Sequence, residues 1–203
     1  MQVEQRMLLP QGVTISSLMQ PADYEKLRKY FADSLHTDIT AMDNKKPMAL
    51  QQIALYAFID GETESFELYF LKQCMAQKKP IKGLETIDTQ LNIFDSIPYA
   101  EQLQWLLDGI ADTVNTDTLW NSLIDSYKNE NLHQIAELII QSSPEIMAYE
   151  NLWLTDRNKN WIPVIETLMQ ENSTFIAVGA GHLPFDTGIL QLLSNKGYTL
   201  KAL

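Results

Sequence analysis

Helical hydrophobic periodicity constrains the fold of this chain more than any other feature of its sequence. Apolar residues recur at three- and four-residue spacing over most of the 203 residues, and each such segment would bury one face of a helix. The region from about 98 to 171 is predicted to be a helical insertion or subdomain. The other predicted helices run from 21 to 35, from Pro47 to near Gly61, from Phe66 to about Lys78, and from Ile189 to Gly197.

Three short segments carry strand patterns instead. Residues 81–85 alternate apolar and other side chains, residues 174–179 are rich in β-branched residues, and residues 198–203 form another extended segment after the last predicted helix. The predicted fold class is therefore helix-rich α/β, with a small mixed sheet and a C-terminal βαβ unit. Because three strands are few for so many helices, we expect an exposed sheet edge or a homodimer that pairs this edge.

The composition is that of a folded protein, with 45% hydrophobic and 20% charged residues. At this length a single domain over 1–203 is expected. The 26 Asp and Glu residues outnumber the 15 Lys and Arg residues, so the net charge of −11 repels phosphate backbones and argues against nucleic-acid binding. No apolar run approaches the roughly 20 residues of a membrane-spanning helix. The first residues lack a secretory signal pattern, so the signal of an exported protein would lie outside this chain.

His182 is the first candidate site residue. It stands in the segment 177–184, AVGAGHLP, where a predicted buried strand ends in Gly179 and Gly181. Ligands of α/β proteins collect beyond the carboxyl ends of strands, and glycines let a ligand or backbone approach closely. Alternatively, the glycines only make a turn and His182 is a hydrogen-bonded structural histidine. One histidine cannot make a metal site, since zinc-like ions need about three protein ligands.

Glu85, Arg157 and Asn158 are further candidates. Glu85 follows the strand-like segment and would serve as a metal ligand or general base, or would simply begin the next helix, where acids favour the dipole. Arg157 and Asn158 lie in a polar helical stretch beside Trp161. They would clamp a carboxylate or an oxyanion, or would form a solvated helix face. The chain has no H-E-x-x-H, C-x-x-C or G-x-S-x-G motif, which leaves zincin, redox and hydrolase-elbow functions unsupported.

Three segments, taken in order, resemble the TraB/GumN family, which is related to the Tiki and ChaN-like proteins. They are PIKGLET at 80–86, DRNKNW at 156–161 and AVGAGHLP at 177–184. The segment LPQG at 9–12 extends the similarity toward the beginning, so nearly the whole chain is covered. The family's first G-x-x-H motif has no counterpart here. The resemblance therefore implies an N-terminally incomplete domain.

The resemblance also implies a site. Gly179 and His182 would form the second G-x-x-H motif, with Gly181 as a further cofactor-binding position, and Glu85, Arg157 and Asn158 would line the same cleft. Family members have been proposed as metalloproteases or metal-dependent hydrolases, in which a divalent ion (Mn²⁺, Co²⁺ or Zn²⁺) lowers the pKa of its water and Arg157 or Asn158 steadies the oxyanion. Without the first motif, metal binding is expected to be weak or absent and this chain to be inactive.

The expected function is thus part of a metal-dependent hydrolase acting on a peptide or a small molecule. A non-catalytic binding or scaffold protein on the same fold is the alternative. A third reading is a helical interaction protein that uses the region from about 98 to 171. Relatives of this kind are bacterial and often exported, periplasmic or lipid-anchored, which is the localisation that the resemblance implies.

Overall fold

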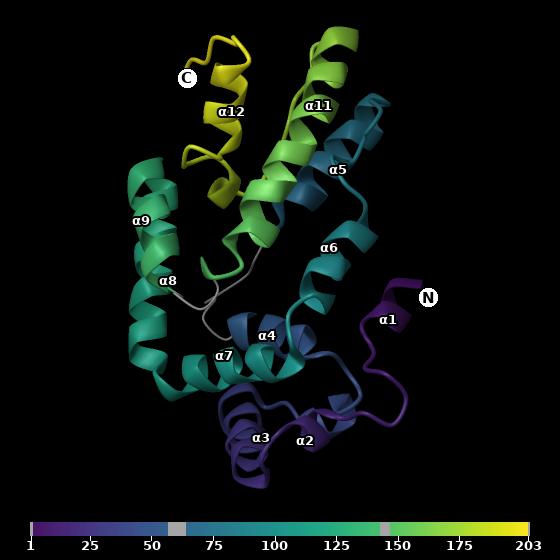
Figure 1. Ribbon diagram of the computed structural model, residues 1–203, viewed down its shortest axis with the longest axis vertical. Coiled ribbons are helices and arrows are strands. Elements are labelled where there is room, and N and C mark those ends of the chain that lie inside the picture. The colour runs from purple at the N-terminus through teal and green to yellow at the C-terminus, as the bar shows by residue number, and fades with distance from the viewer. Residues whose placement is uncertain (1, 57–63, 143–146, 203) are drawn as a thin grey trace. The chain divides into compact units, whose positions relative to one another are not determined.

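Helices make up most of the computed structural model, which describes residues 2–56, 64–142 and 147–202 (Figure 1). The α-helices are α1 (Gln2–Arg6), α2 (Ile15–Leu18), α3 (Pro21–Leu35), α4 (Pro47–Tyr56), α5 (Phe66–Gln77), α6 (Ile87–Asp95), α7 (Tyr99–Ala111), α8 (Thr113–Lys128), α9 (Leu132–Ser142), α11 (Asp156–Glu171) and α12 (Ile189–Asn195). Short 3₁₀ turns form η1 (Ile39–Met42) and η3 (Ala180–His182), and a π-helical turn, η2 (Asn151–Thr155), leads into α11. The periodic segments predicted as helices are helical wherever the structure describes them, whereas the predicted end near Gly61 lies outside the described residues.

The predicted α/β fold class, with its small mixed sheet and C-terminal βαβ unit, is wrong. Across the described residues, the one β-type pairing is an isolated antiparallel bridge between Leu8 and Lys45. The segments 81–85, 174–179 and 198–202 are neither helical nor paired with a strand. A sheet forms only where a second extended backbone lies about 4.8 Å away, which local alternation of side chains cannot supply. The predicted edge of that sheet is therefore also absent.

The chain divides into two compact units, and neither unit is one continuous stretch. The first comprises residues 1–63 and 88–117, and the second comprises residues 64–87 and 118–203. The predicted helical region from about 98 to 171 is thus shared between them.

The core of the first unit is built on α3, α4 and α7. Leu27 and Phe31 lie four residues apart on one face of α3 and are fully buried, as the periodicity predicts. Leu50 of α4 and Leu103 of α7 complete this core. The side-chain amide of buried Gln102 donates to the carbonyls of Phe94 and Ile97, at 2.8 and 2.9 Å, and so holds the turn between α6 and α7.

The core of the second unit lies between α11 and α12, which run next to each other (Figure 1). Trp161, Ile162 and Ile165 of α11 pack against Ile189 and Leu193 of α12. The segments predicted as strands each add a partly buried side chain to this core, and these side chains are Leu84, Ile176, Val178 and Tyr198. No described helix is long and apolar enough to cross a membrane.

Candidate functional site

The first two turns of α11 carry the polar side chains around which the candidate site is built. Trp161 follows Arg157 by four residues and Asn158 by three, so it lies next to both of them on one side of the helix. Asn158 and Trp161 are buried and Arg157 is half-buried. This side of α11 faces Glu85 and the segment that carries His182.

A bidentate ion pair joins Arg157 to Glu85. The Nε and Nη2 atoms of Arg157 donate to the carboxylate, with a shortest distance of 2.6 Å, and Trp161 Nε1 donates to Glu85 Oε2 at 3.1 Å. The guanidinium also lies over the Trp161 ring, 4.8 Å from its centroid, and its Nη1 donates to the carbonyl of Trp153. The Glu85 side chain is only 9% exposed. Its two oxygens are thus engaged by a cation and an indole N–H, which makes Glu85 a poor metal ligand in this arrangement.

A buried hydrogen bond between His182 and Asn158 fixes the state of the imidazole. The Asn158 amide nitrogen donates to the carbonyl of Thr187 at 2.9 Å, which turns Oδ1 toward His182 Nδ1 at 2.7 Å. Because an amide oxygen can only accept, Nδ1 carries the proton and donates. Nε2 of the neutral ring therefore keeps its lone pair.

Burial holds His182 neutral. The pKa of His182 lies at about 4, below its ordinary value of 6.5; desolvation lowers it most, the positive charge of Arg157 lowers it as well, and the negative charge of Glu85 opposes both. The Trp161 ring covers the imidazole, with 4.5 Å between the ring centroids. At neutral pH the side chain is thus an uncharged nitrogen donor held in one orientation.

This depressed pKa predicts a pH-dependent stability. Between pH 6.5 and pH 4 the unfolded chain binds a proton at His182 that the folded chain does not bind. The stability from the neutral ring is therefore fully present above pH 6.5 and is lost as the pH falls toward 4, by up to about 1.4 kcal/mol per pH unit. Urea unfolding of the wild type and of His182→Gln across this range measures it. We expect the free energy of unfolding of the wild type to approach that of His182→Gln as the pH falls. If the two free energies change with pH in parallel, the low pKa of His182 is contradicted.

Glycines shape the backbone around His182. Gly179 begins the η3 turn, where its carbonyl accepts from the His182 N–H at 2.9 Å. A Cβ on Gly181 would lie 3.2 Å from Ile139 Cδ1, whereas one on Gly188 would lie 1.8 Å from the Pro184 carbonyl oxygen. Gly188 thus permits the tight closure of the loop that brings Thr187 to Asn158.

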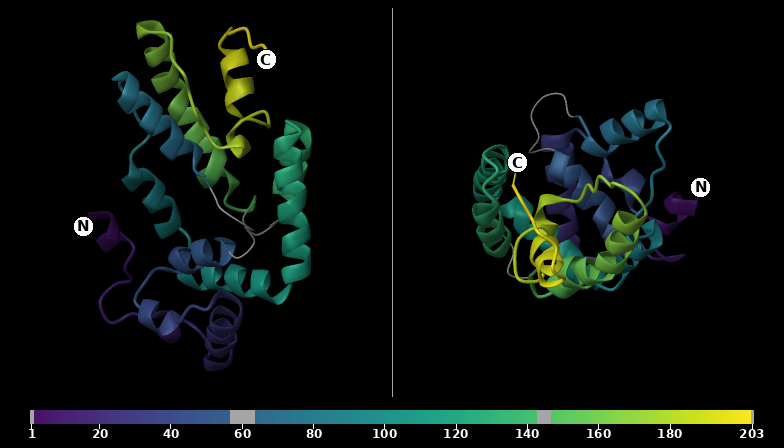
Figure 2. Two further views of the ribbon diagram at one scale, coloured as in Figure 1. Left: turned by 180° about the vertical axis from the view of Figure 1, so that it is seen from behind. Right: turned by 90° about the horizontal axis from the view of Figure 1, so that it is seen from above.

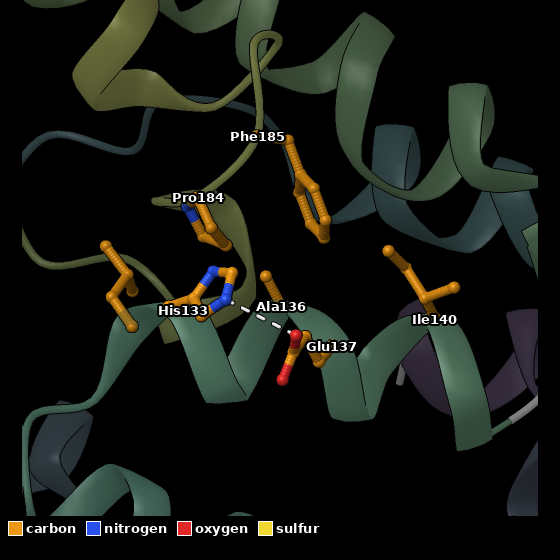
Figure 3. Close-up of a pocket in the computed structure, with 7 residues that line it drawn as sticks. His133, Ala136, Glu137, Ile140, Pro184 and Phe185 are labelled. Atoms are coloured by element: carbon orange, nitrogen blue, oxygen red, sulfur yellow. Dashed lines mark ion pairs between the residues drawn. The ribbon is translucent and has the colours of Figure 1, made fainter.

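An open apolar cavity of about 430 Å³ lies beside this loop, between it and α9 (Figure 3). Pro184 and Phe185 line it from the loop side, and Phe185 has a left-handed backbone with φ of 72°. His133 and Glu137 line it from α9, where His133 Nε2 lies 3.3 Å from Glu137 Oε1. The cavity therefore offers an apolar contact surface within three residues of His182.

The sequence model of the TraB/PrgY/gumN family matches residues 1–202. The chain belongs to the TraB/PrgY/gumN family. This membership confirms the resemblance seen in the three sequence segments. No curated protein sequence and no solved structure matches the chain.

In this TraB/PrgY/gumN protein, the four predicted polar site residues lie in one network. Glu85 and Arg157 form its ion pair, Asn158 and His182 form its hydrogen bond, and Trp161 contacts both pairs. Their catalytic and metal-binding roles stay predictions, as does the cofactor-binding role of Gly179 and Gly181. Sequence reasoning missed Trp161 as a site residue. Its position four residues after Arg157 and three after Asn158 could have indicated that Trp161 lies beside them on the same helix.

The residues of this TraB/PrgY/gumN protein do not by themselves fit a complete metal site. Among the described residues, no group of three His, Cys, Asp or Glu side chains is placed to hold an ion. Zinc-like sites take about three protein ligands. His182 Nε2 suits one such position, and the oxygens of Glu85 are already engaged.

Proposed function

We propose that this protein supplies part of a metal-dependent hydrolase site, in which His182 is a ligand, and that the chain alone is inactive. The observation that carries the proposal is the buried hydrogen bond from His182 Nδ1 to Asn158 Oδ1, at 2.7 Å. Metal-binding histidines usually donate their second ring nitrogen to an oxygen in this way, which sets the tautomer and aims the lone pair. The family relationship supports the same reading.

The pKa of about 4 favours a ligand over a general base. A base works best when its pKa lies near the working pH, and a pKa of about 4 makes His182 a weak proton acceptor at neutral pH. The same low pKa leaves its lone pair available to an ion without first releasing a proton. His182 thus supplies one nitrogen ligand, and the other ligands of the metal ion would have to come from outside the described residues.

The neighbours of His182 act through position and charge. Asn158 is only 1% exposed and bonds His182 and Thr187, so it is a positioning residue rather than one that touches substrate. Arg157 is held by Glu85 and lowers the pKa of His182 through its charge. The apolar cavity beside the loop would accept an apolar part of a peptide or small-molecule substrate.

Calorimetry with Mn²⁺, Co²⁺ and Zn²⁺ on the wild type and on His182→Ala tests the proposal. We expect weak binding to the wild type and none to His182→Ala, because one fixed imidazole remains a donor even where the ligand set is incomplete. His133→Ala is the matched control, since His133 is 86% exposed in the same unit and should leave binding unchanged. Broadening of the His182 ring signals by Mn²⁺ in NMR spectra gives a second readout. Binding that persists in His182→Ala contradicts the assignment.

A non-catalytic binding or scaffold protein on the same fold is the second candidate. The engagement of both Glu85 oxygens by Arg157 and Trp161 favours it, because that carboxylate would then serve structure alone. In that case neither calorimetry nor Mn²⁺ broadening should detect an ion at His182 in the wild type.

A further inference from the structure

Phe185 has a left-handed backbone at a place where glycine would fit without cost. Its φ is 72°, and its carbonyl accepts from the Gly188 N–H at 3.0 Å. The other described non-glycine residues with positive φ stand at or just past the ends of helices, and they are His36, Lys78 and Glu130. This backbone costs free energy in a residue with a Cβ, whereas glycine adopts it readily. Closure of the loop thus explains the backbone at 185 but not the phenylalanine side chain.

The ring of Phe185 forms one wall of the apolar cavity beside α9. Helix α9 lies beside the η3 turn (Figure 2), and the ring reaches from the loop after η3 toward that helix (Figure 3). Among the described residues, the side chains that pack on the core between α11 and α12 do not include Phe185. Strained backbone gathers at ligand-binding sites, where the surrounding structure maintains it. The ring therefore belongs to the cavity rather than to the core.

The cavity suits one large apolar side chain of a longer molecule. Leu132, Ala136 and Ile140 line it from α9, and Pro184 and Phe185 line it from the loop. Its volume of about 430 Å³ lies near the lower end of the roughly 300–1,000 Å³ that ligand sites occupy. Because the cavity is open on one side, the rest of the bound molecule would stay in solvent. An aromatic or branched aliphatic side chain of a peptide meets these conditions.

The charges around the cavity favour a cation next to that side chain. Glu137 lines the cavity from α9 with a side chain that is 55% exposed, and exposed Asp186 follows Phe185 in the loop. His133 Nε2 lies 3.3 Å from Glu137 Oε1, and a carboxylate has about four acceptor positions, so this contact does not saturate it. No Lys or Arg occurs from residue 129 to 156 or from 160 to 195, and both lining segments lie in these stretches. A positive charge beside the apolar side chain is therefore attracted.

We propose that this cavity is a substrate subsite, which takes an aromatic or branched aliphatic side chain of a peptide whose next residue is Lys or Arg. The inference rests on the proposed function, because Phe185 stands three residues after His182 in the same loop. The ring of Phe185 supplies apolar contact to the bound side chain. The carboxylate of Glu137 selects the charge of the next residue.

Titration of the full chain with acetyl-Phe-Lys-amide, followed by two-dimensional NMR without added metal, tests the subsite. We expect signal shifts in α9 and the loop 183–187, with a dissociation constant about threefold or more below that of acetyl-Phe-Glu-amide. Acetyl-Gly-Lys-amide lacks the apolar side chain and should not bind detectably. Glu137→Gln should bind the Lys and Glu peptides about equally. Glu25→Gln is the matched control, because Glu25 is 59% exposed and ion-paired on α3 in the first unit, and it should keep the preference.

Phe185→Gly separates a ligand-binding role of the ring from a structural one. Relief of the left-handed backbone offsets the extra freedom of glycine in the unfolded chain, so the variant should unfold at about the wild-type urea concentration. It should still bind acetyl-Phe-Lys-amide about tenfold more weakly, because one wall of the cavity is lost. Phe175→Gly is the control, since Phe175 is 74% exposed and does not line the cavity, and it should bind like the wild type.

Wild-type affinity in Phe185→Gly, or peptide shifts that lie outside α9 and the loop, overturns the proposal. A Phe185→Gly variant that also unfolds at a much lower urea concentration overturns it as well, because the ring would then support the fold. The absence of metal keeps this result apart from the proposed function. Metal binding at His182 without peptide binding overturns the subsite alone. Peptide binding in the cavity without metal binding at His182 supports the subsite and overturns the metal role.

Discussion

Replacing Arg157 by methionine is expected to lower the free energy of unfolding by about 3–5 kcal/mol. The substitution leaves the Glu85 carboxylate, whose side chain is 9% exposed, without the cation that it meets at 2.6 Å. It also removes the guanidinium from the Trp161 ring and from the carbonyl of Trp153. A buried charge that loses its partner costs far more than the pair itself contributes. Unfolding in urea, followed by tryptophan fluorescence, measures the effect.

Two further variants show whether the loss of stability in Arg157→Met comes from the burial of the Glu85 charge. Arg28→Met breaks an ion pair of the same 2.6 Å distance, to Glu25 on the exposed surface of α3, and should change stability little. The double variant Arg157→Met with Glu85→Leu should recover much of the loss, since it leaves no unpaired carboxylate. Equal effects of Arg157→Met and Arg28→Met would show that the Glu85 pair is not desolvated.

Gly188→Ala is expected to cost roughly 3 kcal/mol or more, above the usual range for overpacking, because the new methyl would meet backbone rather than a flexible side chain. Its Cβ would lie 1.8 Å from the carbonyl oxygen of Pro184 and 2.4 Å from that of Leu183. The loop must open to relieve this clash, which withdraws the carbonyl of Thr187 from Asn158. Urea unfolding measures the loss, and the NMR signals of the His182 ring report the freed Asn158.

Gly109→Ala is the control for adding a methyl group to a glycine. No heavy atom lies within 4 Å of a Cβ at Gly109, which is inside helix α7. Alanine favours a helix over glycine, so this variant should gain about 0.5–1 kcal/mol. Wild-type stability and an unchanged His182 signal in Gly188→Ala would mean that the loop is not closed as described.

The spacing of apolar residues predicted the helices correctly and the sheet wrongly, because helices and strands find their backbone hydrogen-bond partners in different ways. A helix satisfies its own backbone, so the spacing of Leu27 and Phe31, with Pro21 at the start, is enough to predict α3. A strand needs a second backbone from elsewhere in the chain or from another chain. The alternation at 174–179 correctly indicates which side chains face the core, but it contains no information on whether a neighbour is present.

In the candidate site, too, the sequence predicts which residues take part but not how they pair. The family resemblance gathers Glu85, Arg157, Asn158 and His182 into one region, and the structure places them in one network. No pattern along the chain shows that the partner of Glu85 is Arg157, 72 residues later, or that Asn158 is buried against His182. Such pairings depend on how α11 packs in the second unit. In the structure Glu85 is paired with Arg157 and Asn158 is hydrogen-bonded to His182, while the catalytic roles predicted for Glu85 and Asn158 stay predictions.

The division of each unit between separate stretches of chain also sets an order of events during synthesis. Residues 64–87 leave the ribosome before residues 88–117, which belong to the other unit, and well before α11. The Glu85 carboxylate therefore has to remain in water until Arg157 has been made. Contacts that close such long loops are slow to form. The second unit is thus expected to mature late, and neither unit can be obtained intact by cutting the gene once.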